Sequence, residues 1–147
     1  MSKTKIIISV IFFISIIIGI IFLYPFPLDE IISNDGGLTV IYMEAIGVDE
    51  KPIEYKKYYY EADSTEYERI KQILSKYTYH RNMRSFRDIS SFVGNDAGYL
   101  LRLYSGENSM VSSGTGEIMI NNHVYNIGYW GNEKALSLME EIHSVLN

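Results

Sequence analysis

The longest apolar stretch of the chain runs from Ile6 to Leu23 and contains no charged residue. Eighteen helical residues, at about 1.5 Å of rise each, cover roughly 27 Å, which is close to the hydrocarbon thickness of a bilayer. Pro25 and Pro27 then end the helix, and Tyr24 and Phe26 stand where interfacial aromatic residues are expected. The pattern therefore predicts a membrane-spanning helix.

Charges on the two sides of this stretch give it a direction. Lys3 and Lys5 precede it, whereas Asp29 and Glu30 follow it. Lys and Arg near a span favour the cytoplasmic side, so we expect a cytoplasmic N-terminus and a C-terminal domain outside the cell membrane.

A cleaved signal peptide and a buried helix of a soluble protein are the alternatives. The boundary sequence FLYPFP contains no small-x-small cleavage site, and the absence of cysteine excludes a lipoprotein signal. We therefore expect an uncleaved signal-anchor over residues 1–27, a linker over 28–37 and an extracytoplasmic α+β domain over 38–147.

The pattern changes after the linker, whose Asn34, Asp35, Gly36 and Gly37 are typical turn residues. Short β-branched and aromatic runs alternate with two amphipathic segments, which predicts an antiparallel sheet with two helices on one face. Strands are expected at residues 38–43, 53–61, 77–83, 99–105, 110–112, 117–120 and 123–127, and helices at 64–76 and 133–146. Neither face of 53–61 is cleanly apolar, which favours an edge strand.

Charge and cysteine content limit the classes of function. The chain has 147 residues and a net charge of −5; without Lys3 and Lys5 the outer part has eleven basic and eighteen acidic residues. A net acidic domain binds nucleic acid poorly, because phosphate contacts need Lys and Arg. With no cysteine, disulfides and thiolate metal sites are excluded.

Three arginines, Arg81, Arg84 and Arg87, form a basic cluster beside His80 in this acidic domain. Guanidinium groups bind paired oxygens, so the cluster could hold a lipid headgroup, a phosphate of a wall polymer or an acidic partner. The alternative is an ordinary solvated loop with Asp88 or other acids as partners.

Tyrosine is used heavily, with thirteen in the chain. The run Tyr58 to Tyr60 must expose at least one ring if it is a strand, and Tyr129 and Trp130 lie in a GYWG turn. Amphipathic aromatic residues on a surface favour contacts with proteins or sugars. They could instead fill the core and cover the edge of a small sheet.

Other motifs point to no chemistry. SSGTGE precedes a predicted strand rather than a helix, which excludes a phosphate-binding loop, and Gly94-Asn95-Asp96 has too few ligands for calcium. His80, His123 and His143 fall on three elements without metal-ligand spacing, and no G-x-S-x-G motif exists. We expect no cofactor, no metal and no catalytic residue.

Three segments resemble a known family: TYHR (78–81), NDAGYLLRLYS (95–105) and GTGEIMINNHVYNIGYWGN (114–132). They are similar to small membrane-anchored proteins of Gram-positive bacteria that carry a domain of unknown function. The resemblance implies a single anchored domain and assigns no activity.

We therefore predict a single-pass cell-membrane protein, held in the membrane by residues 6–23, whose outer domain binds an anionic envelope ligand or a membrane-proximal protein. The candidate ligand-binding residues are Arg81, Arg84, Arg87, Tyr129 and Trp130. One alternative is an envelope hydrolase that uses carboxylates with His80 or His123. Another is an immunity-type protein that protects the cell.

Overall fold

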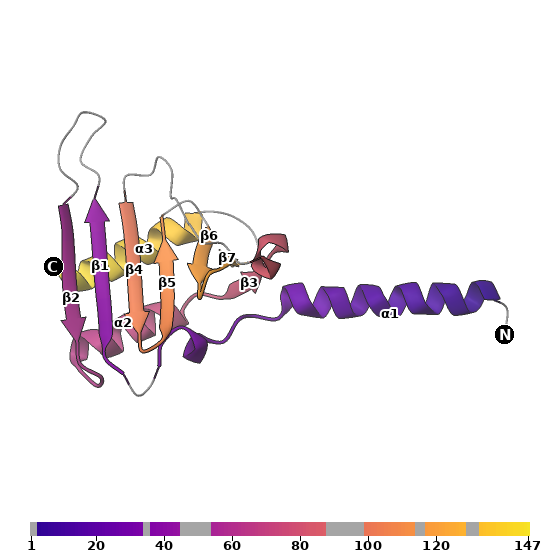
Figure 1. The fold of residues 1–147 in the computed structure, drawn as a ribbon, viewed down its shortest axis with the longest axis horizontal. Coiled ribbons are helices and arrows are strands. Elements are labelled where there is room, and N and C mark those ends of the chain that lie inside the picture. Colours follow the sequence, from indigo (N-terminus) through magenta and orange to yellow (C-terminus); the bar gives the residue numbers. More distant parts are fainter. Residues whose placement is uncertain (1–2, 34–35, 45–53, 88–98, 114–116, 129–132) are drawn as a thin grey trace, which may run out of the picture.

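In the computed structural model, a long helix leads into a sheet with two further helices (Figure 1). The structure describes residues 3–33, 36–44, 54–87, 99–113, 117–128 and 133–147. Helix α1 covers Lys3–Leu23, and the 3₁₀ helix η1 follows at Leu28–Glu30. Helix α1 is long and apolar enough to cross a membrane, and none of its residues is buried. A core helix of a soluble protein would be mostly buried, so this observation argues against that alternative.

Seven strands form one sheet in the order β2-β1-β4-β5-β6-β7-β3, and every neighbouring pair is antiparallel. The strands are β1 Leu38–Glu44, β2 Glu54–Tyr60, β3 Tyr79–Arg81, β4 Tyr99–Ser105, β5 Asn108–Ser112, β6 Glu117–Ile120 and β7 His123–Ile127. The predicted α+β class is confirmed, and β2 is an edge strand as its mixed composition indicated.

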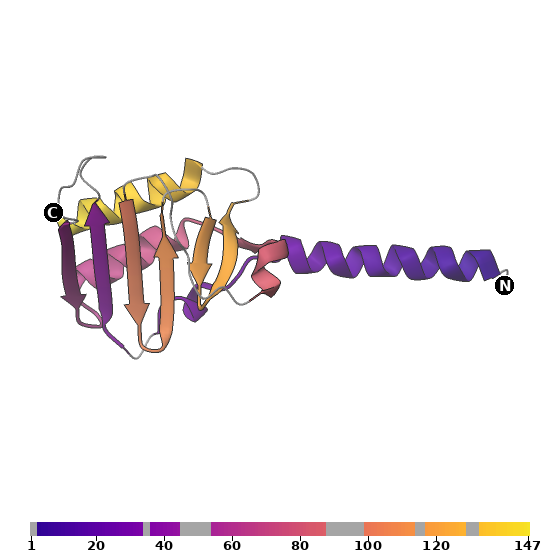
Figure 2. The same cartoon turned by 45° about the horizontal axis from the view of Figure 1, so that its top comes forward.

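Helices α2 (Thr65–Ser75) and α3 (Glu133–Leu146) lie on the same side of the sheet in both ribbon views (Figures 1 and 2). Helix α2 begins at Ser64, whose hydroxyl accepts a hydrogen bond from the Tyr67 amide at 3.2 Å. The apolar stripes of both helices are buried in one core cluster with the sheet.

Strand alternation gives the sheet one face covered by α2 and α3 and one face that neither of these helices covers. Leu38, Val40 and Tyr42 are buried, and the Tyr42 ring stacks on His143 of α3 with centroids 4.3 Å apart. The residues between them, such as Thr39 and Ile41, therefore point to the opposite side. We call that side the open face.

The predicted hairpin between β6 and β7 is confirmed. Asn121 and Asn122 both have positive φ, 48° and 68°, which is the conformation of a two-residue hairpin turn that asparagine tolerates. This turn sets the register in which Ile120 pairs with His123.

The predicted linker differs from the structure. Residues 28–33 include η1, and Ile31 and Ile32 are fully buried in the core together with Phe26. The Ser33 amide donates to Ser105 Oγ at 3.0 Å, and its carbonyl accepts from the Tyr67 hydroxyl at 3.0 Å. The chain is thus packed into the core soon after α1, because these apolar side chains find partners that a local pattern does not reveal.

The strand expected at 77–83 is shorter in the structure. Strand β3 covers Tyr79–Arg81 alone, and a second 3₁₀ helix, η2, follows at Met83–Phe86. Asn82 ends the strand because its side chain caps η2, accepting from the Arg84 amide at 2.8 Å.

Candidate functional site

The end of α1 is joined directly to strand β3. The Phe26 amide donates to the Tyr79 carbonyl at 2.6 Å, and Pro25 forms an isolated β-bridge with His80. The Phe26 ring is buried and lies 4.7 Å from the Tyr125 ring, centroid to centroid. These contacts fix the direction in which the helix leaves the rest of the fold.

His80 lies at this junction and is buried. Burial lowers the pKa of its imidazole below the usual value, whereas interaction with the backbone of Leu23 and Phe22 raises the pKa and partly offsets that effect. The last carbonyls of a helix lack intrahelical partners, so the imidazole helps to satisfy the end of α1. The neutral imidazole of His80 therefore lies between the end of α1 and the sheet and contributes to their contact.

Helix η2 packs beside the same junction. Its capping box is complete, since the Asn82 amide donates to Ser85 Oγ at 2.8 Å while the Asn82 side chain accepts from the Ser85 amide at 3.2 Å. The hydroxyl of Ser85 also donates to the Val124 carbonyl of β7. The η2 segment is thus held firmly, although it is only four residues long.

Two large apolar side chains of η2 are exposed, Met83 at 77% and Phe86 at 58%. The Phe86 ring makes an edge contact with Phe22 of α1, with centroids 5.8 Å apart. Contact with water is unfavourable for an exposed apolar side chain such as Phe86. Phe86 also touches the last turn of the helix that is long and apolar enough to span a membrane.

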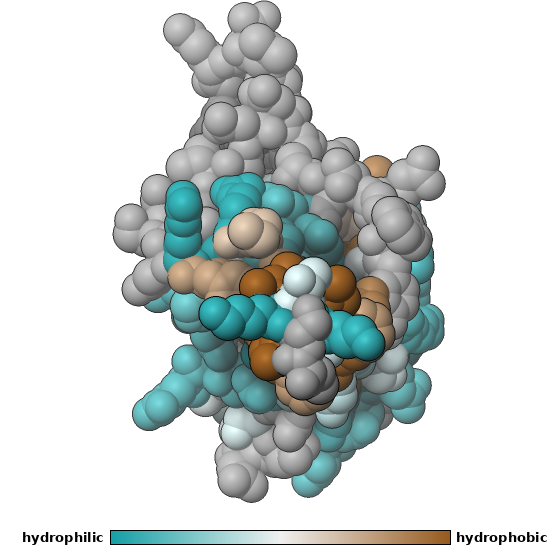
Figure 3. Space-filling model, turned by 90° about the vertical axis from the view of Figure 1, so that its right-hand side faces the viewer, coloured by the Kyte–Doolittle hydropathy of each residue, from teal (hydrophilic) through white to brown (hydrophobic). Residues whose placement is uncertain are grey.

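The three predicted arginines share this segment. Arg81 ends β3, Arg84 belongs to η2, and Arg87 immediately follows η2. Arg84 forms an ion pair with Glu117 of β6. By register, Arg81 pairs with Tyr125 and shares the face of Tyr79, whereas Glu117, the partner of Arg84, is on the open face. We call Met83, Arg84, Phe86 and Arg87 the junction patch. In a view along the axis of α1, the apolar helix lies in front of the rest of the protein, whose described surface is mainly hydrophilic (Figure 3).

Tyr129 and Trp130 were also predicted as ligand-binding residues. They lie outside the residues that the structure describes. Their role therefore stays a prediction.

The open face of the sheet carries a second group of surface residues, which the sequence prediction did not single out. Along edge strand β2, Tyr55, Lys57 and Tyr59 point to this face, and the two tyrosines are 67% and 66% exposed. The alternation in IEYKKYYYE indicates that Tyr55, Lys57 and Tyr59 share one face of the strand. Which face of the sheet this is depends on the strands that pair with β2.

Strand register brings further polar groups to the open face. Ile41 of β1 pairs with Lys57 on one side and with Arg102 of β4 on the other. Thr39 pairs in the same way with Tyr59 and Tyr104. We call Tyr55, Lys57, Tyr59, Arg102 and Tyr104 the tyrosine–cation surface.

Among the described residues, no ion pair is formed by the cations of this surface. Within the described residues, Arg102 Nε is buried and has no hydrogen-bond partner. The described strand residues on the open face include one acid, Glu117, and Arg84 already binds it. Lys57 is exposed and Arg102 is partly exposed, and ammonium and guanidinium groups bind anions through charge-assisted hydrogen bonds, so this position favours an anion.

One polar pocket lies between α2 and α3 and includes Arg69, Gln72, Lys76 and Glu141. Lys76 Nζ and the Tyr77 hydroxyl each donate to Glu141, both at 2.6 Å. These two hydrogen bonds lower the pKa of the Glu141 carboxyl. The carboxylate is therefore an ion-pair partner that joins the two helices rather than a proton carrier.

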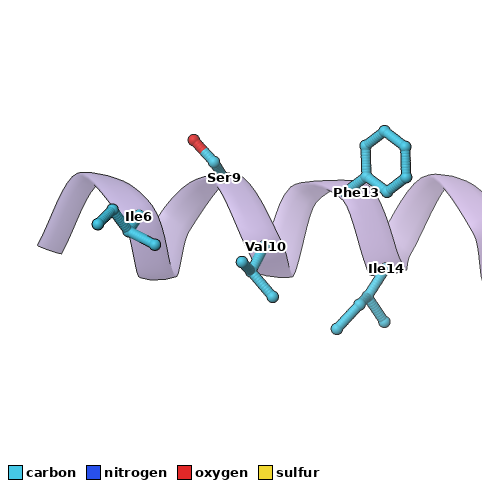
Figure 4. Close-up of a pocket in the computed structure, with 5 residues that line it drawn as sticks. All are labelled: Ile6, Ser9, Val10, Phe13 and Ile14. Atoms are coloured by element: carbon cyan, nitrogen blue, oxygen red, sulfur yellow. The ribbon is translucent and has the colours of Figure 1, made fainter. Parts of the chain in front are cut away.

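A shallow groove runs along α1 and is lined by Ile6, Ser9, Val10, Phe13 and Ile14 (Figure 4). All five lining residues belong to α1, and their side chains are exposed. Nearby, the Ser15 hydroxyl donates to the Ile11 carbonyl at 2.9 Å. Polar groups satisfied within the helix are what a lipid environment requires.

The other two histidines lie apart from one another and from His80. His143 stacks on Tyr42 and contacts Asn147, while His123 Nδ1 is buried in β7. Within the described residues, no group of three or more His, Asp or Glu side chains could hold a metal ion. The positions of these histidines lend no support to the alternative of an envelope hydrolase.

No protein-family model, no curated protein and no solved structure matches this chain. The resemblance to anchored proteins of Gram-positive bacteria therefore stays a prediction.

Proposed function

We propose that this protein is a single-pass membrane protein whose outward domain binds an anionic ligand of the cell envelope on the open face of its sheet. The observation that carries the proposal is the tyrosine–cation surface, where Lys57 and Arg102 flank Ile41 and where Glu117 is the one acid among the described strand residues of the open face. Lys3 and Lys5 support a cytoplasmic N-terminus, which leaves the sheet outside.

The chemistry of this surface suits a polymer that carries both rings and negative charge. Neighbouring strands lie about 4.8 Å apart, so Lys57 and Arg102 are about 10 Å apart at their Cα atoms and can reach one ligand. Tyrosine rings offer flat apolar area with a polar tip, which suits contact with sugar rings. The cations then bind carboxylate or phosphate groups between the rings.

The surface also lies far from the bilayer in this arrangement. The strands run across the axis of α1, with β3 next to the helix and β2 at the far end of the sheet (Figures 1 and 2). Six spacings between seven strands amount to about 29 Å. Strand β4, which carries Arg102, is four spacings or about 19 Å from β3, so the ligand is reached about 2–3 nm above the membrane.

The test measures binding of full-length protein in lipid nanodiscs to three soluble polymers. Polyglycerol phosphate carries phosphates, polygalacturonate carries carboxylates on sugar rings, and dextran is uncharged. We expect the unmodified protein to bind an anionic polymer but not dextran. Which anion binds more tightly identifies the ligand class.

Replacing both Lys57→Gln and Arg102→Gln should weaken this binding at least about tenfold, because a charge-assisted hydrogen bond contributes about 1.5–3 kcal/mol. Lys56→Gln is the matched control. Lys56 is exposed on the same strand but points to the other face, where it pairs with Tyr42. Equal losses in both variants, or no binding to either anionic polymer, would overturn the proposal.

Orientation has its own test, because the chain contains no cysteine. A single cysteine at Tyr59 should react with a membrane-impermeant maleimide in intact cells, and one at Lys3 should react only after lysis. The reverse pattern would place the domain in the cytoplasm.

A further inference from the structure

We infer that η2 rests on the membrane: Met83 and Phe86 enter the interfacial region of the bilayer that holds α1, and Arg84 and Arg87 bind lipid phosphates. This inference rests on the proposed anchoring of α1. It does not depend on ligand binding at the open face.

The depth of Phe86 follows from its contact with Phe22. Phe22 is the penultimate residue of α1, about 1.5 Å along the axis from the last one. The two rings are 5.8 Å apart, so Phe86 lies level with the last turn of the helix. When α1 spans a bilayer, that turn lies at the boundary between hydrocarbon and headgroups. Phe86 must then lie at this boundary too.

The periodicity of η2 places Met83 beside Phe86. Side chains three residues apart eclipse each other in a 3₁₀ helix, so Met83 and Phe86 share one edge. Arg84 lies on the adjacent edge of η2, and Arg87 follows η2 directly with extended backbone, so both basic side chains are close to the apolar edge. An apolar edge next to a basic edge is the arrangement of segments that lie in a membrane interface, with the guanidinium groups directed to phosphates.

The pairing of Arg84 with Glu117 is compatible with this role. A guanidinium group has five N–H donors, and a carboxylate takes two of them at most. The ion pair therefore holds Arg84 at the edge of β6 while leaving donors for a phosphate.

The junction leaves little freedom for another placement. Phe26 is hydrogen-bonded to Tyr79 only three residues after the end of α1, and its ring is buried. The bridge between Pro25 and His80 adds a second attachment. With so short a connection, turning η2 away from the bilayer would break the contact between Phe86 and Phe22 of α1. The bilayer, rather than a protein partner, is therefore the occupant that the structure favours.

The experiment uses nitroxide spin labels on single cysteines in the full-length protein, reconstituted in nanodiscs of phosphatidylcholine and phosphatidylglycerol. Labels at Met83 and Phe86 are compared with a label at Ile14 in α1 and one at Tyr59 on the open face. Collision with oxygen reports lipid exposure, and collision with a nickel chelate reports water exposure.

We expect the labels at positions 83 and 86 to be shielded from the nickel chelate, with values between those at 14 and 59. If the label at 14 is in lipid while those at 83 and 86 are as accessible to the chelate as the one at 59, the membrane contact of η2 is overturned and anchoring survives. If the label at 14 is itself in water, the anchoring fails and this inference fails with it.

A second comparison tests the arginines. Arg87→Gln, alone and combined with Arg84→Gln, should move the label at 86 toward water in nanodiscs with phosphatidylglycerol. Arg69→Gln removes an exposed arginine from α2 and should change nothing. The single Arg87 variant keeps the pair between Arg84 and Glu117 intact, so its effect does not come from that pair. An equal response to Arg69→Gln would contradict a role for these arginines.

Discussion

The two ends of the sheet are built very differently. At one end, β3 is three residues long, its Tyr79 and His80 are buried, and residues 25–26 continue onto it. At the other end, β2 is seven residues long and has exposed tyrosines and lysines. In the described part of the chain, nothing pairs with the outer edge of β2.

The difference shows how the fold divides two tasks. The edge at β3 is covered, as buried edges must be, and its apolar contacts continue into α1. The edge at β2 is protected by charge instead, because Lys56 and Lys57 disfavour pairing with another strand. Attachment thus occupies one end, and the surface that we propose for binding occupies the other.

Removing a core contact at the attached end should have the largest effect. Phe26→Ala should lower the free energy of unfolding by about 3–5 kcal/mol, because a buried ring is lost beside Tyr125. Tyr55→Ala at the free end should change it by less than about 0.5 kcal/mol. Urea unfolding of the full chain in micelles measures both. Similar losses would mean that the two ends are equally structural.

The free end has one sensitive position, Gly37. A Cβ atom there would lie 2.6 Å from the Tyr59 hydroxyl oxygen and 2.8 Å from the Tyr60 carbonyl oxygen, and the latter belongs to the backbone. Gly37→Ala should therefore cost about 1–3 kcal/mol and speed hydrogen exchange in β2. Gly19→Ala is the control, because no atom lies within 4 Å of the added Cβ. No difference between the two variants would refute this reason.

Acid should weaken the attached end selectively. Burial lowers the pKa of His80, so below about pH 6.5 the unfolded chain binds a proton that the folded chain does not. The contribution of neutral His80 is present above that pH and is lost as the pH falls toward the folded pKa, at up to about 1.4 kcal/mol per pH unit.

The readout is the urea midpoint between pH 7 and pH 5. His80→Asn removes the titrating group, so its midpoint should depend less on pH than that of the unmodified protein. If the urea midpoint of His80→Asn depends on pH as strongly as that of the unmodified protein, another group causes the pH dependence.

The smallest effect is expected in the helix layer that connects the ends. Glu141 has a lowered pKa, so its contribution is present above the usual carboxyl pKa, near 4.3, and is lost as the pH falls through the folded value. Because the pair with Lys76 is largely exposed, Glu141→Gln should cost less than about 1 kcal/mol at pH 7. Added salt should reduce this loss of stability. Glu140→Gln is the control and should cause no loss.

Strong periodic signals made much of the fold predictable. The uninterrupted apolar run gave α1, the apolar stripe gave α3 with its bounds at 133 and 146, and Asn121-Asn122 gave a hairpin. Ile31 and Ile32 were missed because two apolar residues among turn formers have no period. Their burial depends on partners distant in the sequence.

The arginine cluster was easier to predict from the sequence than the tyrosine–cation surface. Arg81, Arg84 and Arg87 are close in sequence, so their grouping was visible without the fold. The tyrosine–cation surface joins β2 to β4 through β1, and only the register places Lys57 and Arg102 on either side of Ile41. The contact of Phe86 with Phe22 likewise depends on how α1 meets β3.

The orientation of the strands across α1 has a mechanical consequence. A ligand fixed to the cell wall and held at β2 would pull the sheet away from the membrane, at right angles to its strands. Such a load opens hydrogen-bonded ladders one bond at a time, from the outermost strand inward, instead of shearing many bonds together. The free end would therefore yield first under tension, while the buried junction at β3 would keep the sheet attached to α1.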